Sequence, residues 1–161
     1  MDDIVRPIVL TVLIKENRIL MIKRTLGDYV DYFGLPGGKI EIAEHLSGSA
    51  EREAYEETRL KTKFSSLLGV VSEHLWDEDN LKEHFLLFVC SMEIISKDEF
   101  DYDDELLEWF DLDKLKEASA GIIPSDLIMV KHFLREKDCR FIECDLKKHD
   151  NQYKIISLRL Y

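Results

Sequence analysis

The stretch from Gly34 to Leu60 constrains the fold more than any other part of the sequence. It opens with Leu35-Pro36-Gly37-Gly38, in which proline fixes its own φ and the glycines allow backbone conformations closed to other residues. A segment without proline follows, from about Glu44 to Thr58, and it is rich in Glu, Ala, Leu and Arg, which favour helices. The pattern predicts a turn that leads into a helix.

Three carboxylates gather toward the end of this predicted helix. At about 100° per residue, Glu53, Glu56 and Glu57 fall within an arc of about 100°. The apolar stripe of the helix runs beside that arc, so Glu53 and Glu57 should face the protein. Buried carboxylates need compensation, and divalent cations would provide it. A solvated acidic face is the alternative, which the stripe and the glycine turn disfavour.

The spacing of these residues resembles the Nudix box, the signature of hydrolases that act on nucleoside diphosphates linked to another group. Gly38 is followed after five residues by Glu44, and after seven more by Arg52-Glu53-Ala54-Tyr55-Glu56-Glu57, with Leu60 beyond. The preceding Leu35-Pro36-Gly37 matches as well. The resemblance covers about residues 6–135. It implies an α/β fold, the Nudix-type α/β/α sandwich in which a mixed β-sheet lies between helices.

Two positions depart from the family pattern. Ile42-Ala43 replaces the usual Pro-Gly before the first glutamate, and Arg59 replaces the glycine after the glutamate pair. A glycine at a helix end normally takes a left-handed C-cap, which is strained for arginine. The departure affects the expected cap geometry rather than the metal ligands.

The resemblance also implies a mechanism that depends on Mg²⁺ or Mn²⁺. The implied ligands are Glu53, Glu56, Glu57 and the Gly37 carbonyl. The metals would neutralise diphosphate oxygens and lower the pKa of a water aimed at phosphorus. Glu44 and Arg52 would brace the loop and the helix. Nudix-like proteins often place a further catalytic glutamate on a later loop. In the acidic stretch 98–113 we expect this to be Glu105, with Asp104 and Glu108 as alternatives.

Candidate substrate-binding residues flank the box. Lys23-Arg24 resembles a basic pair common in the family, and one of the two would contact a phosphate or carboxylate unless both are solvated. Tyr32 lies in the loop before the box and could stack on a base. Trp76 opens the polar stretch 76–80, a predicted loop, and is either a lid over the base or a partly buried anchor.

The composition limits the classes of partner that the protein can bind. A single domain of 161 residues with net charge −11 is a poor match for a nucleic-acid polymer, but it can take a small nucleotide through metal ions. An odd number of cysteines without a metal-type repeat favours a reduced, cytoplasmic protein. The start of the chain lacks the positive region of a signal peptide, and no apolar run approaches a membrane span.

The remaining chain predicts strands and one late helix. The strands are expected at residues 7–14 and 19–24, paired as a hairpin, and at 67–74 and 83–94. The helix should run from Pro124 to about Lys137. Residues 138–161 form a C-terminal extension, expected as a β-hairpin that makes an edge or a homodimer contact. Cys139, Cys144 and His149 lack a fourth ligand, which argues against zinc there.

These features predict a MutT-like nucleotide pyrophosphohydrolase that cleaves a diphosphate linkage in a nucleoside triphosphate or a nucleoside diphosphate derivative. The alternatives are an ADP-ribose or nucleotide-sugar pyrophosphatase, a non-catalytic Nudix-fold nucleotide sensor, and an acidic metal-binding protein. No proline lies between Pro36 and Pro124, so the downstream proline typical of ADP-ribose hydrolases is missing.

Overall fold

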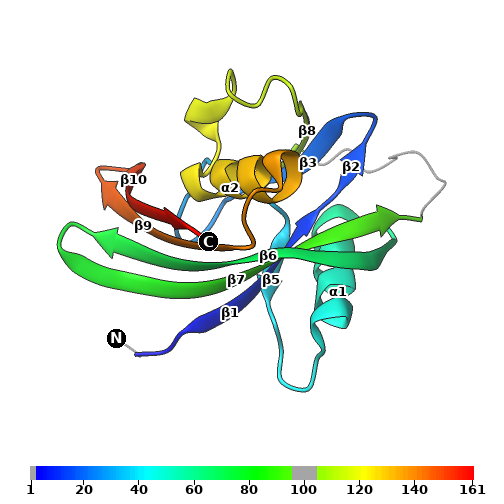
Figure 1. The fold of residues 1–161 in the computed structure, drawn as a ribbon, viewed down its shortest axis with the longest axis horizontal. Helices are drawn as coiled ribbons and strands as arrows, with labels where there is room; N and C mark the ends of the chain where they lie inside the picture. Colours follow the sequence, from blue (N-terminus) through cyan, green and yellow to red (C-terminus); the bar gives the residue numbers. More distant parts are fainter. Residues whose placement is uncertain (1–2, 96–104) are drawn as a thin grey trace.

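A six-stranded mixed sheet forms the centre of the protein (Figure 1). The computed structural model describes residues 3–95 and 105–161. The strand order is β10-β9-β6-β7-β1-β5, with β1 parallel to β7, β6 parallel to β9, and the other pairs antiparallel. The strands are β1 (Arg6–Val12), β5 (Gly37–Lys39), β6 (Thr62–Asp77), β7 (Asn80–Ile94), β9 (Phe141–His149) and β10 (Gln152–Leu160).

A smaller sheet is built around β3 (Arg18–Lys23), which pairs with three short strands. These are β2 (Ile14–Lys15), β4 (Phe33–Gly34) and β8 (Leu107–Asp111). The expected hairpin is only partly correct, because β1 ends at Val12 and pairs with β5 and β7 rather than with β3. The hairpin is instead β2–β3, and its two turn residues, Glu16 and Asn17, both have positive φ (53° and 60°), as tight hairpin turns require.

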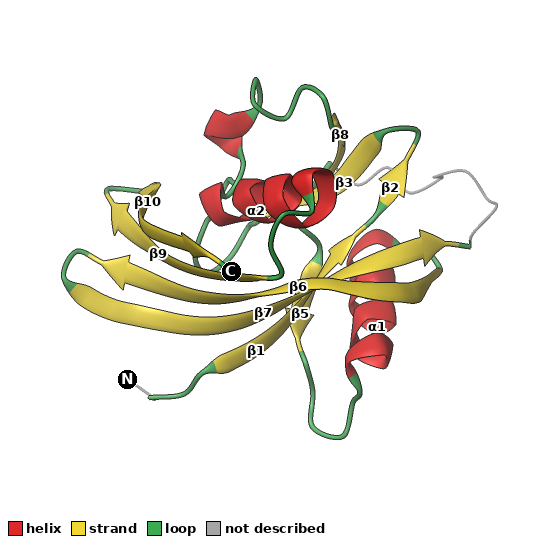
Figure 2. Ribbon diagram, viewed as in Figure 1, coloured by secondary structure: helices red, strands yellow, loops and turns green. Residues whose placement is uncertain are grey.

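Helices cover both faces of the six-stranded sheet (Figure 2). Helix α1 (Leu46–Thr58) packs on one face, while α2 (Pro124–Met129), continued by η2 (Val130–Glu136), packs on the other. A short turn, η1 (Ser119–Gly121), precedes α2. Val9 and Leu10 point into different cores, one under each helix, because successive strand residues face opposite ways. The predicted α/β/α sandwich is confirmed. Within residues 3–95 and 105–161, no helix is long and apolar enough to cross a membrane.

Strands β6 and β7 form a long hairpin that is joined by two residues, Glu78 and Asp79. The predicted loop over residues 76–80 is therefore correct in place but too long, since only Glu78 and Asp79 form the turn and Trp76 lies within β6. The charged residues there did not interrupt the strand because they lie on its exposed tip, where the backbone ladder still forms. Along β6, Val71, Glu73 and Leu75 are buried in alternation.

The C-terminal segment widens the central sheet instead of standing apart from it. The predicted hairpin is present as β9 and β10, and β9 pairs in parallel with β6. Strand β10 lies at the sheet edge, with Ile156, Leu158 and Leu160 exposed. The homodimer contact stays a prediction.

Candidate metal and substrate site

Two glycines of β5 allow the strand to lie between β1 and helix α1. A Cβ on Gly37 would lie 2.0 Å from the Val9 carbonyl oxygen, and one on Gly38 would lie 2.5 Å from Glu53 Oε1. No side chain fits at either position without moving backbone or carboxylate. The glycine turn and the helix are therefore packed together as one unit.

Helix α1 presents its three acidic side chains at different depths. The side chains of Glu53 and Glu57 are 12% and 22% exposed, whereas that of Glu56 is 55% exposed. This agrees with the helical periodicity, which turns Glu53 and Glu57 toward the protein. The helix begins at Leu46, two residues later than expected, so Glu44 belongs to the preceding loop.

Arg52 ties that loop to the helix. Its guanidinium donates to both carboxylate oxygens of Glu44, at 2.6 and 2.9 Å, and to Glu53 Oε1 at 2.8 Å. Further bonds reach Glu56 at 3.2 Å and the Lys39 carbonyl at 3.1 Å. The hydrogen bonds from Arg52 lower the pKa of Glu44 to about 2. Arg52 thus connects a carboxylate of the loop to two carboxylates of the helix.

Glu57 is the acid bound most closely to the glycine turn. The Gly37 N–H donates to its Oε2 at 2.9 Å, and Arg24 Nη1 lies 3.8 Å from its Oε1. Burial raises the pKa of Glu57, although Arg24 and the Gly37 N–H oppose this. The neighbouring Glu53 and Glu56 charges raise it further. A set of carboxylate oxygens under mutual repulsion fits a hard divalent cation.

Arg59 ends the helix in the left-handed conformation that the family's glycine normally adopts. Its φ and ψ are 61° and 8°, and its N–H donates to the Tyr55 carbonyl at 2.9 Å. Its guanidinium carbon lies 5.6 Å from the centre of the Tyr55 ring. The substitution therefore leaves the cap in place, and the acidic residues one turn earlier keep their helical spacing.

A cavity of about 230 Å³ adjoins the glycine turn. Arg24, Gly37 and Gly38 belong to its lining and also contact the acidic residues of helix α1, and the lining includes two further acids, Glu73 and Asp126. The remaining lining residues are Ile8, Leu10, Leu26, Asp28, Tyr29, Phe85, Leu87 and Ile123. Gly37 and Gly38 therefore separate the carboxylates of helix α1 from a largely apolar cavity that has a few polar groups.

The two buried acids of the cavity were missed by sequence reasoning. Glu73 is 3% exposed; its Oε1 accepts a 2.9 Å bond from the Tyr29 hydroxyl, and its Oε2 has no hydrogen-bond partner in the described part of the chain. Burial raises the pKa of Glu73 to about 7, and the charge of Asp126 raises it further. The nearby Ser125 hydroxyl lowers this pKa, although it makes no well-aligned hydrogen bond. The available signal was an acid at a core-facing position between Val71 and Leu75.

Asp126 joins helix α2 to the segment before the glycine turn. Its Oδ2 accepts a 2.7 Å bond from the Leu35 N–H. Burial raises its pKa to about 6, against the stabilising effects of the Leu35 N–H and Arg24. A Cβ on Gly34 would lie 2.8 Å from Asp126 Oδ2, which explains the small residue there.

The structure separates the expected substrate-binding residues. Arg24 lines the cavity and donates to the Leu35 carbonyl at 3.1 Å. Lys23 instead places its Nζ 5.5 Å from the centre of the Phe33 ring. Tyr32 donates a 3.4 Å bond to the Asn151 carbonyl, and Trp76 Nε1 donates to Asp145 at 2.9 Å. Of the four, Arg24 alone is among the described residues that line the cavity.

The candidates for the catalytic base lie at the start of β8. Glu105 is exposed in the turn before that strand, and Glu108 is exposed within it, opposite Met21 of β3. Residues 98–104 of the acidic stretch, Asp104 among them, lie outside the described residues.

The comparisons with known proteins agree with this geometry. The NUDIX domain model matches residues 5–131. The chain belongs to the Nudix family. This Nudix chain is 21% identical to the MutT protein from Bacillus halodurans, with a TM-score of 0.68 and 97% of each chain covered.

Two curated relatives are similar over part of their length. The chain is 38% identical over 102 residues to an ADP-ribose pyrophosphatase of Methanocaldococcus jannaschii, covering 63% of this chain and 59% of that protein. It is 28% identical over 104 residues to diphosphoinositol polyphosphate phosphohydrolase 3-alpha of Mus musculus, covering 62% and 58%. The Nudix chain thus spans less than two thirds of these relatives.

Proposed function

We propose that this Nudix protein hydrolyses a diphosphate linkage in a nucleoside diphosphate derivative, with Mg²⁺ or Mn²⁺ as cofactor. One observation carries the proposal: the acidic face of α1 and the 230 Å³ cavity share the Gly37–Gly38 wall. A substrate that spans this wall has its diphosphate beside the carboxylates and its other end in the cavity.

The metal ligands are Glu53, Glu56 and Glu57, with the Gly37 carbonyl as a further oxygen donor. A bound divalent cation there supplies charge neutralisation for the diphosphate and acidifies a water ligand. Arg52 holds Glu53 and Glu56 in place from behind. Arg24, which already faces Glu57, is the cation that contacts a substrate phosphate at the cavity wall.

The cavity fits a nucleoside better than a polyphosphate. Arg24 is the only basic residue among its described lining, whereas Asp28, Glu73 and Asp126 are acidic. Asp28 is paired with Lys82, but a highly anionic group would still be repelled by Asp126 and by Glu73 when it is ionised, whereas the N–H groups of a base can donate to their oxygens. Tyr29 and Phe85 supply aromatic surface in the same cavity. We therefore expect the cavity to hold the base of a nucleotide.

The substrate test is a hydrolysis panel with Mg²⁺ and with Mn²⁺. The panel contains nucleoside triphosphates, ADP-ribose, nucleotide sugars and dinucleoside polyphosphates. ADP-ribose is included because the relative from Methanocaldococcus jannaschii is named for it. The free thiols Cys90, Cys139 and Cys144 support a cytoplasmic setting, so the assay is run under reducing conditions.

Glu56→Gln tests whether the carboxylates act in the reaction. Glu56 is the most exposed of the three, so its loss should leave the fold intact. Because stabilisation of transition-state charge by a metal is worth several kcal/mol, we expect kcat to fall by at least about 100-fold. Glu41→Gln is the matched control, since Glu41 is an exposed acid of the loop that precedes helix α1. Nucleotide binding without turnover in the parent protein would instead favour a sensor.

We assign the general base to Glu105. Glu105→Gln should lower kcat by about 100-fold or more and remove the acidic limb of the pH–rate profile, because a base must be ionised to accept a proton. Glu108→Gln, three residues on and also exposed, is the control. An unchanged profile in Glu105→Gln, or the loss of that limb in Glu108→Gln, would contradict the assignment.

A further inference from the structure

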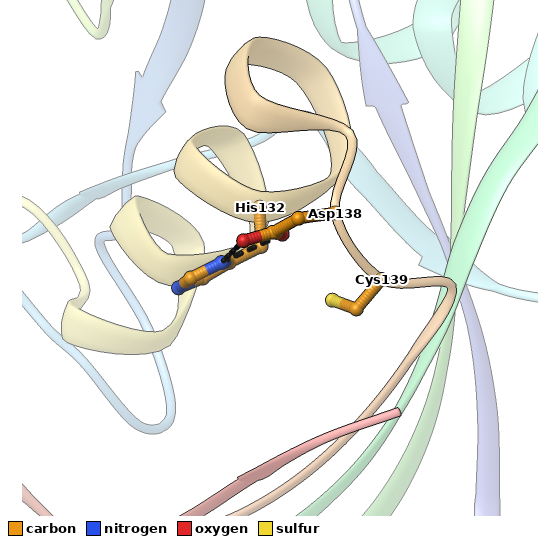
Figure 3. A group of neighbouring side chains, drawn as sticks. All are labelled: His132, Asp138 and Cys139. Carbon is orange, nitrogen blue, oxygen red and sulfur yellow. Dashed lines mark hydrogen bonds and ion pairs between the residues drawn. The ribbon is translucent and has the colours of Figure 1, made fainter.

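A second group of metal-ligating side chains lies at the far end of the α2–η2 helix. It contains an imidazole, a carboxylate and a thiol from His132, Asp138 and Cys139 (Figure 3). This helix packs on the sheet face opposite α1, so the group is separate from the acidic helix of the Nudix box.

The three ligand atoms are already close together. They all lie within 4.8 Å of one another, and His132 Nδ1 is 2.9 Å from Asp138 Oδ1. Glu136 lies beside this group of three, with its Oε2 3.6 Å from the same nitrogen, and is the nearby carboxylate that we assign as the fourth ligand. Bonds of about 2.0–2.3 Å around a tetrahedral zinc ion place ligand atoms roughly 3.3–3.8 Å apart. The three ligand atoms of His132, Asp138 and Cys139 are therefore near the spacing that a tetrahedral cation requires.

The backbone brings these residues together by an unusual helix end. The last turns, Val130–Glu136, are wound as a π-helix, and Lys137 then takes a left-handed conformation with φ 53°. The N–H groups of Lys137 and Asp138 both approach the His132 carbonyl. The chain thus reverses and brings residues 138 and 139 back beside His132. Wide helical turns of this kind are frequent at functional sites.

The donor set selects the metal. Imidazole and thiolate suit a borderline-soft cation such as Zn²⁺, whereas Mg²⁺ prefers the all-oxygen set of the Nudix box. His132 and Cys139 are buried, at 7% and 9% exposure, and the exposed Asp138 leaves a path from solvent. The carbonyl end of a helix also favours positive charge.

We propose that His132, Glu136, Asp138 and Cys139 bind one Zn²⁺ ion, which ties the end of η2 to the start of β9. Binding uses the deprotonated sulfur, so the Cys139 thiol proton leaves to solvent as the S–Zn bond forms. Burial raises the pKa of this thiol, and the metal must overcome that preference. The bound ion anchors the β9–β10 hairpin to the helix that it follows.

Cobalt(II) tests the site, because cobalt bound to a thiolate absorbs in the near ultraviolet and cobalt bound only to oxygen does not. The titration is done on the whole protein with excess Mg²⁺ to occupy the Nudix box. We expect the thiolate band to saturate at one equivalent and to disappear on addition of Zn²⁺. Cys139→Ser should abolish the band. Cys144→Ser should keep it, since Cys144 is a buried thiol of β9 outside the group.

A second pair of variants separates this site from the acidic helix. Removal of a residue that only hydrogen-bonds to a metal ligand costs roughly 10- to 100-fold in metal affinity. Asp138→Asn removes a ligand itself, so a calorimetric titration should show a larger loss of Zn²⁺ affinity. Glu56→Gln should leave the cobalt band unchanged. The absence of a thiolate band in the parent protein would overturn the proposal, whatever the folding of the variants. A band that persists in Cys139→Ser would also overturn it.

Discussion

Two groups of carboxylates on either side of the Gly37–Gly38 wall have opposite electrostatic surroundings. On the helix side, Arg52 contacts Glu44, Glu53 and Glu56 and keeps the pKa of Glu44 near 2. On the cavity side, burial raises the pKa of Glu73 to about 7 and that of Asp126 to about 6. Guanidinium pairing accounts for the low pKa of Glu44, whereas desolvation accounts for the raised pKa values of Glu73 and Asp126 and also raises the pKa of Glu57, which is bound to the glycine turn.

The difference indicates a division of labour between acids of the same chemical type. Ionised carboxylates, held in place by arginine, are suited to binding cations. A carboxyl group that is protonated part of the time near pH 7, as a pKa of about 7 makes Glu73, can donate as well as accept hydrogen bonds, which suits recognition of an uncharged base. Position relative to the glycine wall, rather than residue type, therefore decides what each acid can do.

Gly38→Ala should have the largest effect on the helix side. The new Cβ would lie 2.5 Å from Glu53 Oε1 and would displace that carboxylate. Because a misplacement of about 1 Å costs about 100-fold, we expect kcat to fall by about 100- to 1,000-fold. Steady-state kinetics at saturating Mg²⁺ measures this.

Gly48→Ala is the matched control for that substitution. A Cβ there meets nothing within 4 Å, and the residue lies in the first turn of the same helix. Its kcat should equal that of the parent protein, while the helix gains stability from the lost glycine. Equal kcat values in the two variants would show that Gly38 does not set the position of Glu53.

Glu73→Gln tests the cavity side through the pH dependence of stability. The pKa of Glu73 is about 7 in the folded protein, against an ordinary 4.5. The folded state therefore holds the proton more tightly, and the stability that Glu73 contributes falls as the pH rises from about 4.5 to 7. Glutamine removes this loss and keeps an acceptor for Tyr29. The free energy of unfolding of the variant, relative to that of the parent, should therefore be higher at pH 8 than at pH 4 by up to about 3 kcal/mol.

Urea unfolding at pH 4 and pH 8 measures that difference. Glu83→Gln is the control: Glu83 pairs with Arg6 at 2.7 Å near the surface of β7, outside the cavity lining. A parent-like pH dependence in Glu73→Gln would mean that Glu73 stays ionised in the folded protein, and the comparison between the two groups of acids would fail.

The contrast also separates what the sequence could predict from what it could not. The glycine turn, the helix and the inward direction of Glu53 and Glu57 follow from local spacing, since all lie within one short stretch. Glu73 and Asp126 meet only through the pairing of distant strands and the docking of α2. No periodicity brings β6 and α2 together. Trp76 was misplaced for a related reason, because polar residues at an exposed strand tip resemble a loop.

Arg52→Lys should have the smallest of these effects. It tests whether the charge of Arg52 or the geometry of its guanidinium orients the acids of helix α1. Lysine keeps the positive charge but loses the planar fork that donates to both Glu44 oxygens and to Glu53. We expect the Mg²⁺ concentration for half-maximal turnover to rise about tenfold, the low end of effects at residues that orient metal ligands. The pKa of Glu44, followed by NMR, should rise from about 2 toward its ordinary 4.5. Arg18→Lys, at an exposed pair with Glu16, should change neither quantity. If Arg52→Lys also changes neither, charge alone organises the acids, and the geometry of the guanidinium is incidental.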